Sequence, residues 1–488
     1  MSTKPLPRNG RPQEAASYAQ ALLQGSSWSV SVGEPYASGS LRRVTVPSAP
    51  DRRVHDREIV RLAGPAFLAL VAEPLFLLAD AAIVGHLGTP ELAGLGIAGA
   101  VVQTAVGLCV FLAYGTTASV ARRIGAGDRR GALAQGIDGL WLGVLIGVVT
   151  TAVGVPLARP LVGLFGADAA VSDQATTYLR LAFLGVTPLL LVLASTGVLR
   201  GLQDTRTPLV VAVVGNLANV ALNYALVYAV DLGIAGSAIG TDLAQAGSAA
   251  ALVAVVVRAA RRDGAPLRPD LPGVRRAAHA GTPLVVRTLT LRASLLVTTY
   301  GATTLGATAV ATHQLALTIW TFLAFVLDAI AIAAQALTGR SLGAGDVEGT
   351  RAVTRRMVRW GLVAGAVTGL GLAALSPLLG PLFTGDDAVR GLLVPVLVVA
   401  AVFQPVAGVV FVLDGVLIGA GDGRYLAWGG IVVLAVFAPL ALLAVRVGTD
   451  ARDGLLLLWV AFGVAFMGSR AAVLVRRARG SAWMVTGS

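Results

Sequence analysis

The chain has 488 residues, of which 56% are hydrophobic and only 13% are charged, and its formal net charge is +12. Soluble globular chains carry roughly 25% charged residues, so this composition, with its mean hydropathy of +0.77, argues against an ordinary soluble domain and indicates an integral membrane protein. It also argues against nucleic-acid binding, because the arginines are dispersed over loops and no aromatic-basic motif accompanies them.

The first segment of the chain, residues 1–55, is rich in Ser, Pro, Gly and Arg and has no apolar period. We expect a disordered cytoplasmic tail there, or an over-extended start of the reading frame. The single cysteine, Cys109, lies farther along in an apolar helix and is interpreted as core filling, so no disulfide framework is expected.

Apolar runs of about 20 residues, the length that a helix needs to cross ~30 Å of hydrocarbon, follow one another along the rest of the chain. These runs do not alternate polar and apolar residues, which argues against a β-barrel. We predict twelve membrane-spanning helices, at residues 59–85, 91–117, 131–156, 174–199, 207–230, 233–259, 276–300, 306–338, 348–376, 388–418, 425–446 and 454–476.

Arginines are concentrated in the segments that follow the even-numbered predicted helices. Positive residues near helix ends are retained on the cytoplasmic side of a membrane. We therefore expect a multi-pass protein of the cell inner (cytoplasmic) membrane with both termini in the cytoplasm. We also expect it to be a monomer.

Two loop motifs occur twice with one spacing. GAGD begins at Gly125 and again at Gly343, and LRGLQDTR from Leu199 returns as LIGAGDGR from Leu417, in both cases 218 positions later. Six helices fit into that offset and an even number restores the orientation, so two parallel six-helix repeats are predicted. Within GAGD, a glycine can end the incoming helix and the aspartate can cap the next one. We favour this structural interpretation over direct contact with a substrate.

The repeats divide the chain into a tail, two lobes joined by a linker, and a second tail. Two lobes of this kind are the usual device for alternating access to a site near the middle of the membrane. The sequence contains no phosphate-binding GxxxxGK[ST] loop and no metal-cluster motif, so we expect transport driven by a gradient, without a cofactor, and no enzymatic activity. The predicted parts are residues 1–55 (disordered cytoplasmic tail), 56–260 (N-lobe, helices 1–6), 261–275 (cytoplasmic linker), 276–476 (C-lobe, helices 7–12) and 477–488 (cytoplasmic tail).

Polar residues inside the predicted helices are candidate functional groups, because each is costly in hydrocarbon unless it is paired or hydrated. Glu73 and Asp80 lie seven residues apart in the first helix and therefore share a face. Pro65 and Pro74 interrupt the hydrogen bonds of the same helix and are candidate bending points. For Asp80 we favour coupling to protons or sodium ions over a static hydrogen-bonded carboxylate, whereas for Glu73 both interpretations stay open.

The fifth predicted helix carries three asparagines on neighbouring turns, Asn216, Asn219 and Asn223. Their amides could hydrogen-bond Asp80 across the N-lobe, or they could simply hold helices together. Both interpretations stay open.

The C-lobe carries different polar groups, and the buried charges do not follow the 218-residue repeat: Asp80 maps onto Thr298, and Arg292 maps back onto Pro74. For its arginines and aspartates we favour a structural ion pair over substrate binding. For its histidine we favour a hydrogen-bonding interior role over a proton relay. The candidate residues of a substrate cavity are Arg287, Arg292, His313, Gln314, Asp328 and Asp414.

Several stretches resemble the multidrug and toxic compound extrusion (MATE) family, in particular its branch named for DNA-damage-inducible protein F (DinF). These are LLADAAIVGHLGTPELAGLGIAG, GTTASVARRIGAGD, LRGLQDTRTPLVVAVVGNLANVALNYALVY, ATHQLALTIWTFLAFVLDAIAIAAQALTGRSLGAGD and FVLDGVLIGAGDGRY. The resemblance implies an all-α integral membrane protein with twelve transmembrane helices in two pseudo-symmetric six-helix lobes, arranged in a V. It also implies an antiporter that exports organic, often cationic, compounds in exchange for protons or sodium ions.

The resemblance also implies roles for single residues. Asp80 matches the family's helix-1 aspartate implicated in cation coupling, Pro65 matches the proline where that helix bends, and Asn219 matches the helix-5 asparagine. Asn223 stands where relatives often have aspartate. This departure leaves a single acid in the N-lobe network, which favours the proton as coupling ion.

One alternative is a flippase for a lipid-linked precursor, because relatives in the wider superfamily share the two-lobe architecture and line the cavity with arginine. Arg287 and Arg292 keep this alternative open. A membrane-bound enzyme or receptor would need a clustered nucleophile, metal ligands or a cytoplasmic domain, and none is apparent in the sequence.

Overall fold

A computed structural model describes residues 52–487 of the chain. Residues His55–Ser488 form one unit, and this unit is described below. The predicted tail, residues 1–55, lies outside the described residues except for its last four positions, where the first helix begins.

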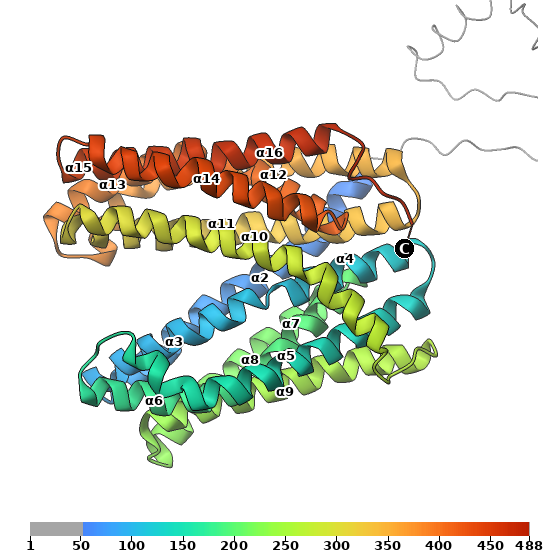
Figure 1. Cartoon of the computed structure of the whole chain (residues 1–488), viewed down its shortest axis with the longest axis horizontal. Coiled ribbons are helices and arrows are strands. Elements are labelled where there is room, and N and C mark those ends of the chain that lie inside the picture. Colours follow the sequence, from blue (N-terminus) through green and yellow to red (C-terminus); the bar gives the residue numbers. More distant parts are fainter. Residues whose placement is uncertain (1–51, 488) are drawn as a thin grey trace, which may run out of the picture. The chain divides into compact units, whose positions relative to one another are not determined.

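The described helices form two bundles, which we call the N-lobe and the C-lobe (Figure 1). The N-lobe contains α2 (Arg52–Gly85), α3 (Thr89–Leu108), α4 (Phe111–Gly125), α5 (Arg129–Gly163), α6 (Ala169–Leu184), α7 (Val186–Gly201), α8 (Arg206–Tyr224), η1 (Ala225–Ala229) and α9 (Gly233–Arg262). The C-lobe contains α10 (Leu271–Thr304), α11 (Ala307–Gly343), α12 (Val347–Phe383), α13 (Asp387–Gly419), α14 (Gly423–Val447), α15 (Ala451–Ala461), η2 (Phe462–Met467) and α16 (Gly468–Arg479).

The helices are long enough to cross a membrane. Ten helical segments in the described part of the chain are sufficiently long and apolar, and the bent pair α6 and α7 adds an eleventh. The remaining pass is α10, which has 34 residues but carries Arg275, Arg276, Arg287 and Arg292. Each of the twelve predicted spans therefore coincides with a helical pass, and the chain is a multi-pass membrane protein.

Four of the predicted spans are interrupted. The second breaks at Cys109 and Val110, between α3 and α4. The fourth bends by 47° at Gly185, between α6 and α7. Pro188 lies in the first turn of α7 and lacks an N–H, so a new helix start is favoured there. The fifth span contains the π-helix η1, and the last span contains the π-helix η2. Hydropathy does not reveal these breaks, because the apolar composition continues through each of them.

The two GAGD loops each end one helix and start the next. Gly127 and Gly345 have φ angles of 77° and 75°, which glycine accepts without strain. The carboxylates of Asp128 and Asp346 accept hydrogen bonds from the N–H three residues later, at 2.8 and 2.7 Å. This N–H, from Gly131, holds the pKa of the Asp128 carboxyl below its usual range. The predicted structural role of the motif is therefore confirmed.

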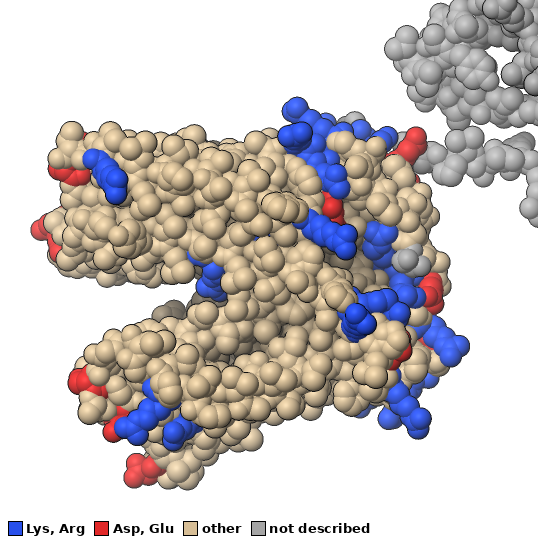
Figure 2. Space-filling view, viewed as in Figure 1, with Lys and Arg blue, Asp and Glu red and all other residues tan. Residues whose placement is uncertain are grey.

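The two ends of the helical unit differ in charge and shape. Basic side chains gather at one end, which we call the arginine-rich end, and an open cleft separates the lobes at the opposite end (Figure 2). At the arginine-rich end α4 contacts α11, and the Gln335 amide donates to the Tyr114 carbonyl across the lobes at 2.6 Å. Nearby, Asp138 of α5 accepts a hydrogen bond from the Asp270 N–H, just before α10, at 3.1 Å. The lobes are thus joined at the arginine-rich end.

Candidate functional site

The N-lobe holds a buried carboxylate whose described partners are all neutral. Asp80 of α2 is 3% exposed. Its Oδ1 accepts hydrogen bonds from Asn223 Nδ2 at 2.8 Å and Ser237 Oγ at 2.5 Å. The Tyr178 hydroxyl of α6 faces the same carboxylate. No arginine, lysine or histidine within residues 52–487 forms an ion pair with Asp80, so no fixed positive charge binds it.

A second layer of polar groups surrounds this carboxylate. The Thr241 hydroxyl accepts hydrogen bonds from the side-chain amides of Asn219 at 3.0 Å and Asn223 at 3.4 Å. The carbonyl oxygens of both amides are buried and have no hydrogen-bond partner in the described part of the chain. Two acceptor oxygens next to a carboxylate are the ligand type that hard cations prefer. The network can therefore hold a proton on Asp80 or offer oxygen ligands to a metal cation.

Helical spacing brings these groups together. Asn219 and Asn223 are four residues apart on α8, and Ser237 and Thr241 are four apart on α9, so each pair shares a face. The α8 and α9 helices pack against each other, and the π-helix η1 lies between them along the chain. Both faces are therefore directed toward Asp80 of α2.

Pro65 and Pro74, the predicted bending points, both lie inside the continuous helix α2. A proline N–H is missing in each case, so a carbonyl one turn earlier loses its helical partner. The Thr205 hydroxyl lies 3.5 Å from the Arg61 carbonyl, the one that Pro65 leaves free. Thr205 thus supports α2 at the carbonyl that Pro65 leaves free.

Glu73 and Asn216 lie next to the network without joining it. The Asn216 amide donates to the Ala72 carbonyl of α2 at 3.1 Å and so holds two helices together. Glu73 is exposed, and among the described side chains none forms a hydrogen bond or ion pair with it. It shares a helix face with Asp80, about two turns away. The structure therefore brings Asn219 and Asn223 to Asp80 but leaves Glu73 and Asn216 outside.

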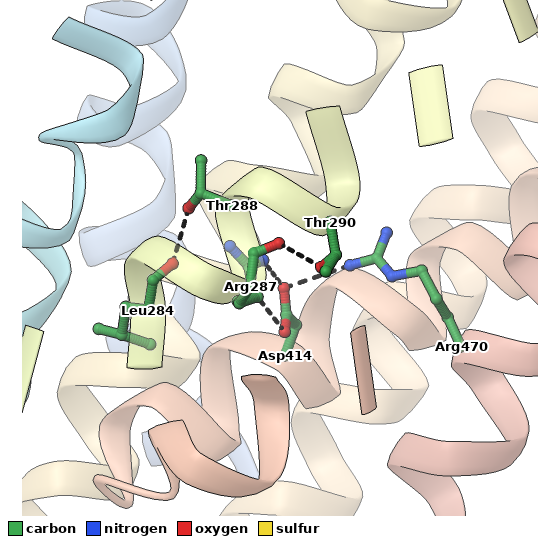
Figure 3. A network of polar contacts seen from close by, with 6 residues as sticks. All are labelled: Leu284, Arg287, Thr288, Thr290, Asp414 and Arg470. Atoms are coloured by element: carbon green, nitrogen blue, oxygen red, sulfur yellow. Dashed lines mark hydrogen bonds and ion pairs between the residues drawn. The ribbon is translucent and has the colours of Figure 1, made fainter. Parts of the chain in front are cut away.

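The C-lobe contains a buried charged cluster (Figure 3). Asp414 of α13 is 6% exposed and forms an ion pair with Arg287 of α10. Arg470 of α16 donates to the same carboxylate at 3.3 Å. The predicted structural ion pair is thus present between Arg287 and Asp414. The sequence analysis did not include Arg470 among the candidate residues, because it lies in the last helix, close to a run of terminal arginines.

The other charged candidates of the C-lobe are less tightly held. Asp328 of α11 is half-buried and within electrostatic range of Arg287, Arg470 and Arg200. Arg292 is exposed, and its guanidinium lies 2.9 Å from where a Cβ on Gly107 of α3 would stand. Arg292 therefore reaches from the C-lobe to the N-lobe.

The two neutral candidates differ in exposure. His313 is fully buried, its Nε2 lies 3.3 Å from the Thr299 hydroxyl, and its ring centroid lies 5.7 Å from that of Trp459. This environment is that of an interior histidine. Gln314, the next residue, is exposed. Only Gln314 of this pair is therefore accessible in the observed conformation.

Sequence reasoning missed the hydroxyl groups of the N-lobe network, Tyr178, Ser237 and Thr241. The four-residue spacing of Ser237 and Thr241 in GSAIGTD was a usable signal. It also missed Asp242, a half-buried acid of α9 next to Thr241. Asp80 is therefore not the only acid of this region. The Asp242 carboxylate lies against Gly185 at the α6–α7 bend, and it is also within electrostatic range of Tyr178. Within residues 52–487 no group of three or more His, Cys, Asp or Glu side chains could hold a metal ion.

Comparison with known proteins gives one consistent result. The family model described as MatE matches residues 65–225 and 283–443, again 218 positions apart. The chain is similar to Protein DETOXIFICATION 44, chloroplastic, of Arabidopsis thaliana, with 32% identity over 77% of this chain and 74% of that protein. It is similar to DNA damage-inducible protein F of Escherichia coli K12, with 28% identity over 88% and 94%.

A solved structure, described as the Vibrio cholerae MATE transporter VcmN in the bent form, covers 88% of this chain and 97% of its own. The TM-score is 0.80 at 22% sequence identity. This likeness shows the fold: the two lobes of the chain are arranged as in that transporter.

Proposed function

Because the chain belongs to the MatE family, whose members are transporters and not enzymes, we propose that it is a secondary active efflux transporter that works by alternating access. In this proposal it exports organic, often cationic, compounds across the cytoplasmic membrane in exchange for protons or sodium ions. The names of its relatives, which concern multidrug resistance and detoxification, support export of foreign compounds.

The observation that carries the proposal is the neutral surrounding of Asp80. A carboxylate that is 3% exposed in a membrane helix is costly to keep charged unless hydrogen bonds or a cation compensate. Its described partners, Asn223 and Ser237, are neutral donors. The group can therefore take up and release a cation without breaking a salt bridge, as an exchanger requires.

Both candidate ions suit this site. A proton would bind the carboxylate directly. A sodium ion would need further oxygen ligands, and the unpartnered carbonyl oxygens of Asn219 and Asn223 could supply them. Asn223 in place of an aspartate makes the network less negative, and this supports the proton.

The difference in charge between the two ends of the helical unit supports an orientation of the chain in the membrane. Arginines at helix ends are retained in the cytoplasm, so the arginine-rich end is the cytoplasmic end in this proposal. The α2 helix begins there with Asp56 bound to Arg356, and α16 ends there, which puts both termini in the cytoplasm. The cleft then opens to the opposite side, which is the state in which a substrate leaves.

A second function, the flipping of a lipid-linked precursor, is favoured by one observation. The C-lobe cluster places Arg287 and Arg470 on one carboxylate, Asp414, and Arg292 adds a further positive charge. A surplus of guanidinium groups suits the phosphate of a lipid headgroup. This function would use the C-lobe rather than Asp80.

The deciding experiment is efflux from proteoliposomes that contain the purified protein, with a fluorescent organic cation as substrate. A proton gradient or a sodium gradient is imposed separately. Asp80→Asn is compared with the native chain. The matched control is Asp242→Asn, the same chemical change in the same lobe, at a carboxylate that lies against Gly185 and takes no part in the hydrogen bonds among Asp80, Asn219, Asn223, Ser237 and Thr241.

We expect gradient-driven efflux to fall to the level of empty liposomes in Asp80→Asn and to persist in Asp242→Asn. The gradient that drives the native chain identifies the ion. Undiminished efflux by Asp80→Asn would contradict the coupling role. Absence of dye transport by the native chain, together with flipping of an anionic lipid that Arg292→Gln abolishes, would favour the flippase.

A further inference from the structure

We propose that Arg122 and Arg340 form a reciprocal latch between the lobes, which holds the arginine-rich end closed, and that release of this latch lets the cleft open at that end. The proposal rests on the alternating-access function proposed above. It concerns a part of the molecule remote from Asp80, and it gives the repeated loops a role beyond ending helices.

The first half of the latch is Arg122 of α4, in the N-lobe. Its guanidinium donates to the carbonyl of Ala420 at 2.8 Å, to that of Val485 at 2.7 Å, and to that of Gly487 at 2.8 Å. Ala420 follows α13, and the other two residues follow α16, so all three acceptors belong to the C-lobe side. A guanidinium has five N–H donors in a rigid fork, so only one placement of the lobes satisfies these bonds together.

The second half is Arg340 of α11, in the C-lobe, 218 positions after Arg122. It donates to the side-chain oxygens of Gln203 at 2.7 Å and Glu58 at 3.2 Å, both in the N-lobe. Gln203 belongs to the first LRGLQDTR-type loop, and Ala420 belongs to the second. Each arginine therefore contacts the copy of this repeated loop that belongs to the opposite lobe.

Glycines let the two helices approach closely enough for this exchange. A Cβ on Gly125 would lie 1.9 Å from the Arg340 carbonyl oxygen, and a Cβ on Gly343 would lie 1.9 Å from the Arg122 carbonyl oxygen. Any side chain larger than hydrogen would therefore push the lobes apart at this point. The first glycine of each GAGD thus serves the contact between lobes, and the second serves the turn.

The C-terminal segment strengthens the first half. Trp483 is 2% exposed and anchors the segment to the C-lobe core, and the Gly487 N–H donates to the Leu342 carbonyl at 3.2 Å. The segment thus lies beside α11 and presents its carbonyls to Arg122. In the described part of the chain Arg122 has no carboxylate partner. Neutral acceptors bind a guanidinium less strongly than a carboxylate does, so this half can open reversibly.

The test measures the separation of the lobes and needs neither a substrate nor a gradient. Spin labels are attached to cysteines at Arg130 and Glu348, which are exposed, belong to different lobes and stand 218 positions apart. The background is Cys109→Ala, because Cys109 is the single native cysteine. Distances between the labels are measured by pulsed electron paramagnetic resonance in lipid nanodiscs.

We expect one short distance in the labelled native chain. In Arg122→Gln/Arg340→Gln the population with separated ends should rise about tenfold or more, because several charge-assisted hydrogen bonds are lost. The matched control is Arg123→Gln, since Arg123 binds Asp128 and Gln135 of its own lobe. It should leave the distance distribution unchanged.

Two further variants keep the proposal testable if the double variant fails to fold. Gly125→Ala should shift the distances in the same direction, whereas Gly115→Ala of the same helix, where a Cβ meets nothing within 4 Å, should not. Removal of residues 485–488 deletes the tail acceptors of Arg122 and should give a smaller shift.

Unchanged distances in the double variant, or equal shifts in Arg122→Gln and Arg123→Gln, would overturn the latch. The outcome is independent of the proposed efflux activity, because a chain that transports nothing still reports the separation of its lobes.

Discussion

The two lobes surround a buried carboxylate in different ways, as Asp80 and Asp414 show. Asp80 in the N-lobe and Asp414 in the C-lobe are 3% and 6% exposed. Neutral amide and hydroxyl groups bind Asp80, whereas the guanidinium groups of Arg287 and Arg470 bind Asp414. A carboxylate with neutral partners can gain or lose a proton without breaking an ion pair, whereas neutralising one between two arginines would break its ion pairs with both.

The repeat shows where this difference arises. The position that corresponds to Asp80 in the C-lobe is Thr298, which is 1% exposed and donates to the carbonyl of Ser294 in its own helix at 2.9 Å. The loops at the arginine-rich end, in contrast, keep the GAGD motif, the arginine three positions before it and the glycine three positions after its aspartate in both lobes. The repeat thus preserves the scaffold and the joint between lobes, while the ionisable chemistry was placed in each lobe separately.

The largest expected effect comes from Asp414→Asn. This variant breaks the ion pairs of two buried arginines, Arg287 and Arg470, and leaves only Asp328 as an acid within their electrostatic range. Breaking a buried ion pair in this way typically costs about 3–5 kcal/mol. Asp80→Asn strands no charge, so its loss of stability should be much smaller. Thermal unfolding in detergent should therefore show a large drop in the apparent Tm for Asp414→Asn alone.

The control for this prediction removes the three charges joined by the ion pairs, in Arg287→Met/Asp414→Leu/Arg470→Met, and leaves Asp328 within electrostatic range of Arg200. Apolar residues of similar volume can replace a buried ionic cluster without loss of stability. The triple variant should recover most of the apparent Tm that Asp414→Asn loses. Equal drops for Asp414→Asn and Asp80→Asn would mean that the two acids do not differ as described.

A smaller effect is expected from Ser237→Ala. The Ser237 hydroxyl donates to Asp80 and so stabilises its ionised form. Hydrogen bonds to charged groups contribute about 1.5–3 kcal/mol, and 1.4 kcal/mol corresponds to about one pH unit. Without this donor the protonated form persists to higher pH, so the midpoint of the pH profile of efflux should rise by about one to two units.

Ser294→Ala is the matched control for this change. Ser294 is buried to the same degree in the C-lobe, but its hydroxyl donates to the Thr290 carbonyl of its own helix. The pH profile should keep its midpoint in this variant. A shift in Ser294→Ala as large as that in Ser237→Ala would indicate a general packing effect.

Much of the fold was predictable from the sequence, because hydropathy and repeat spacing are local properties. The helical passes, the two lobes and the caps at Asp128 and Asp346 follow from them. Asp80 was also identifiable, since an acid in an apolar helix needs a specific reason to be there. The pairing of Arg287 with Asp414 followed from the need of buried charges for partners.

The remaining part of the site depends on which way neutral side chains point. Thr298 donates to its own helix, whereas Ser237 donates to Asp80 on another helix, and both are hydroxyl residues in apolar helices. A sequence does not distinguish these two directions, because they depend on how the helices pack. Because they too depend on how the helices pack, the role of Tyr178 and the contact of Arg122 with Val485, which lies 363 positions away, could not be predicted from the sequence.

The smallest expected effects test whether the scaffold is equivalent in the two lobes. Asp128→Ala and Asp346→Ala each remove an N-cap, which typically costs about 1 kcal/mol. Thermal unfolding should therefore show small drops in apparent Tm that add in the double variant, because the two caps belong to different lobes. Asp173→Ala, which removes an exposed acid that caps no helix, is the control.

The two caps differ in one respect, and this sets the limit on their equivalence. Asp128 also forms an ion pair with Arg123 at 2.9 Å, but both side chains are about a third or more exposed. Such pairs contribute only about 0–1 kcal/mol, so Asp128→Ala should exceed Asp346→Ala by no more than that. A several-fold difference in the loss of stability would mean that the two repeated loops contribute unequally to the stability of the fold. A latch in which Arg122 and Arg340 act as equivalent halves would then need revision as well, since both arginines stand on the helices that these loops end.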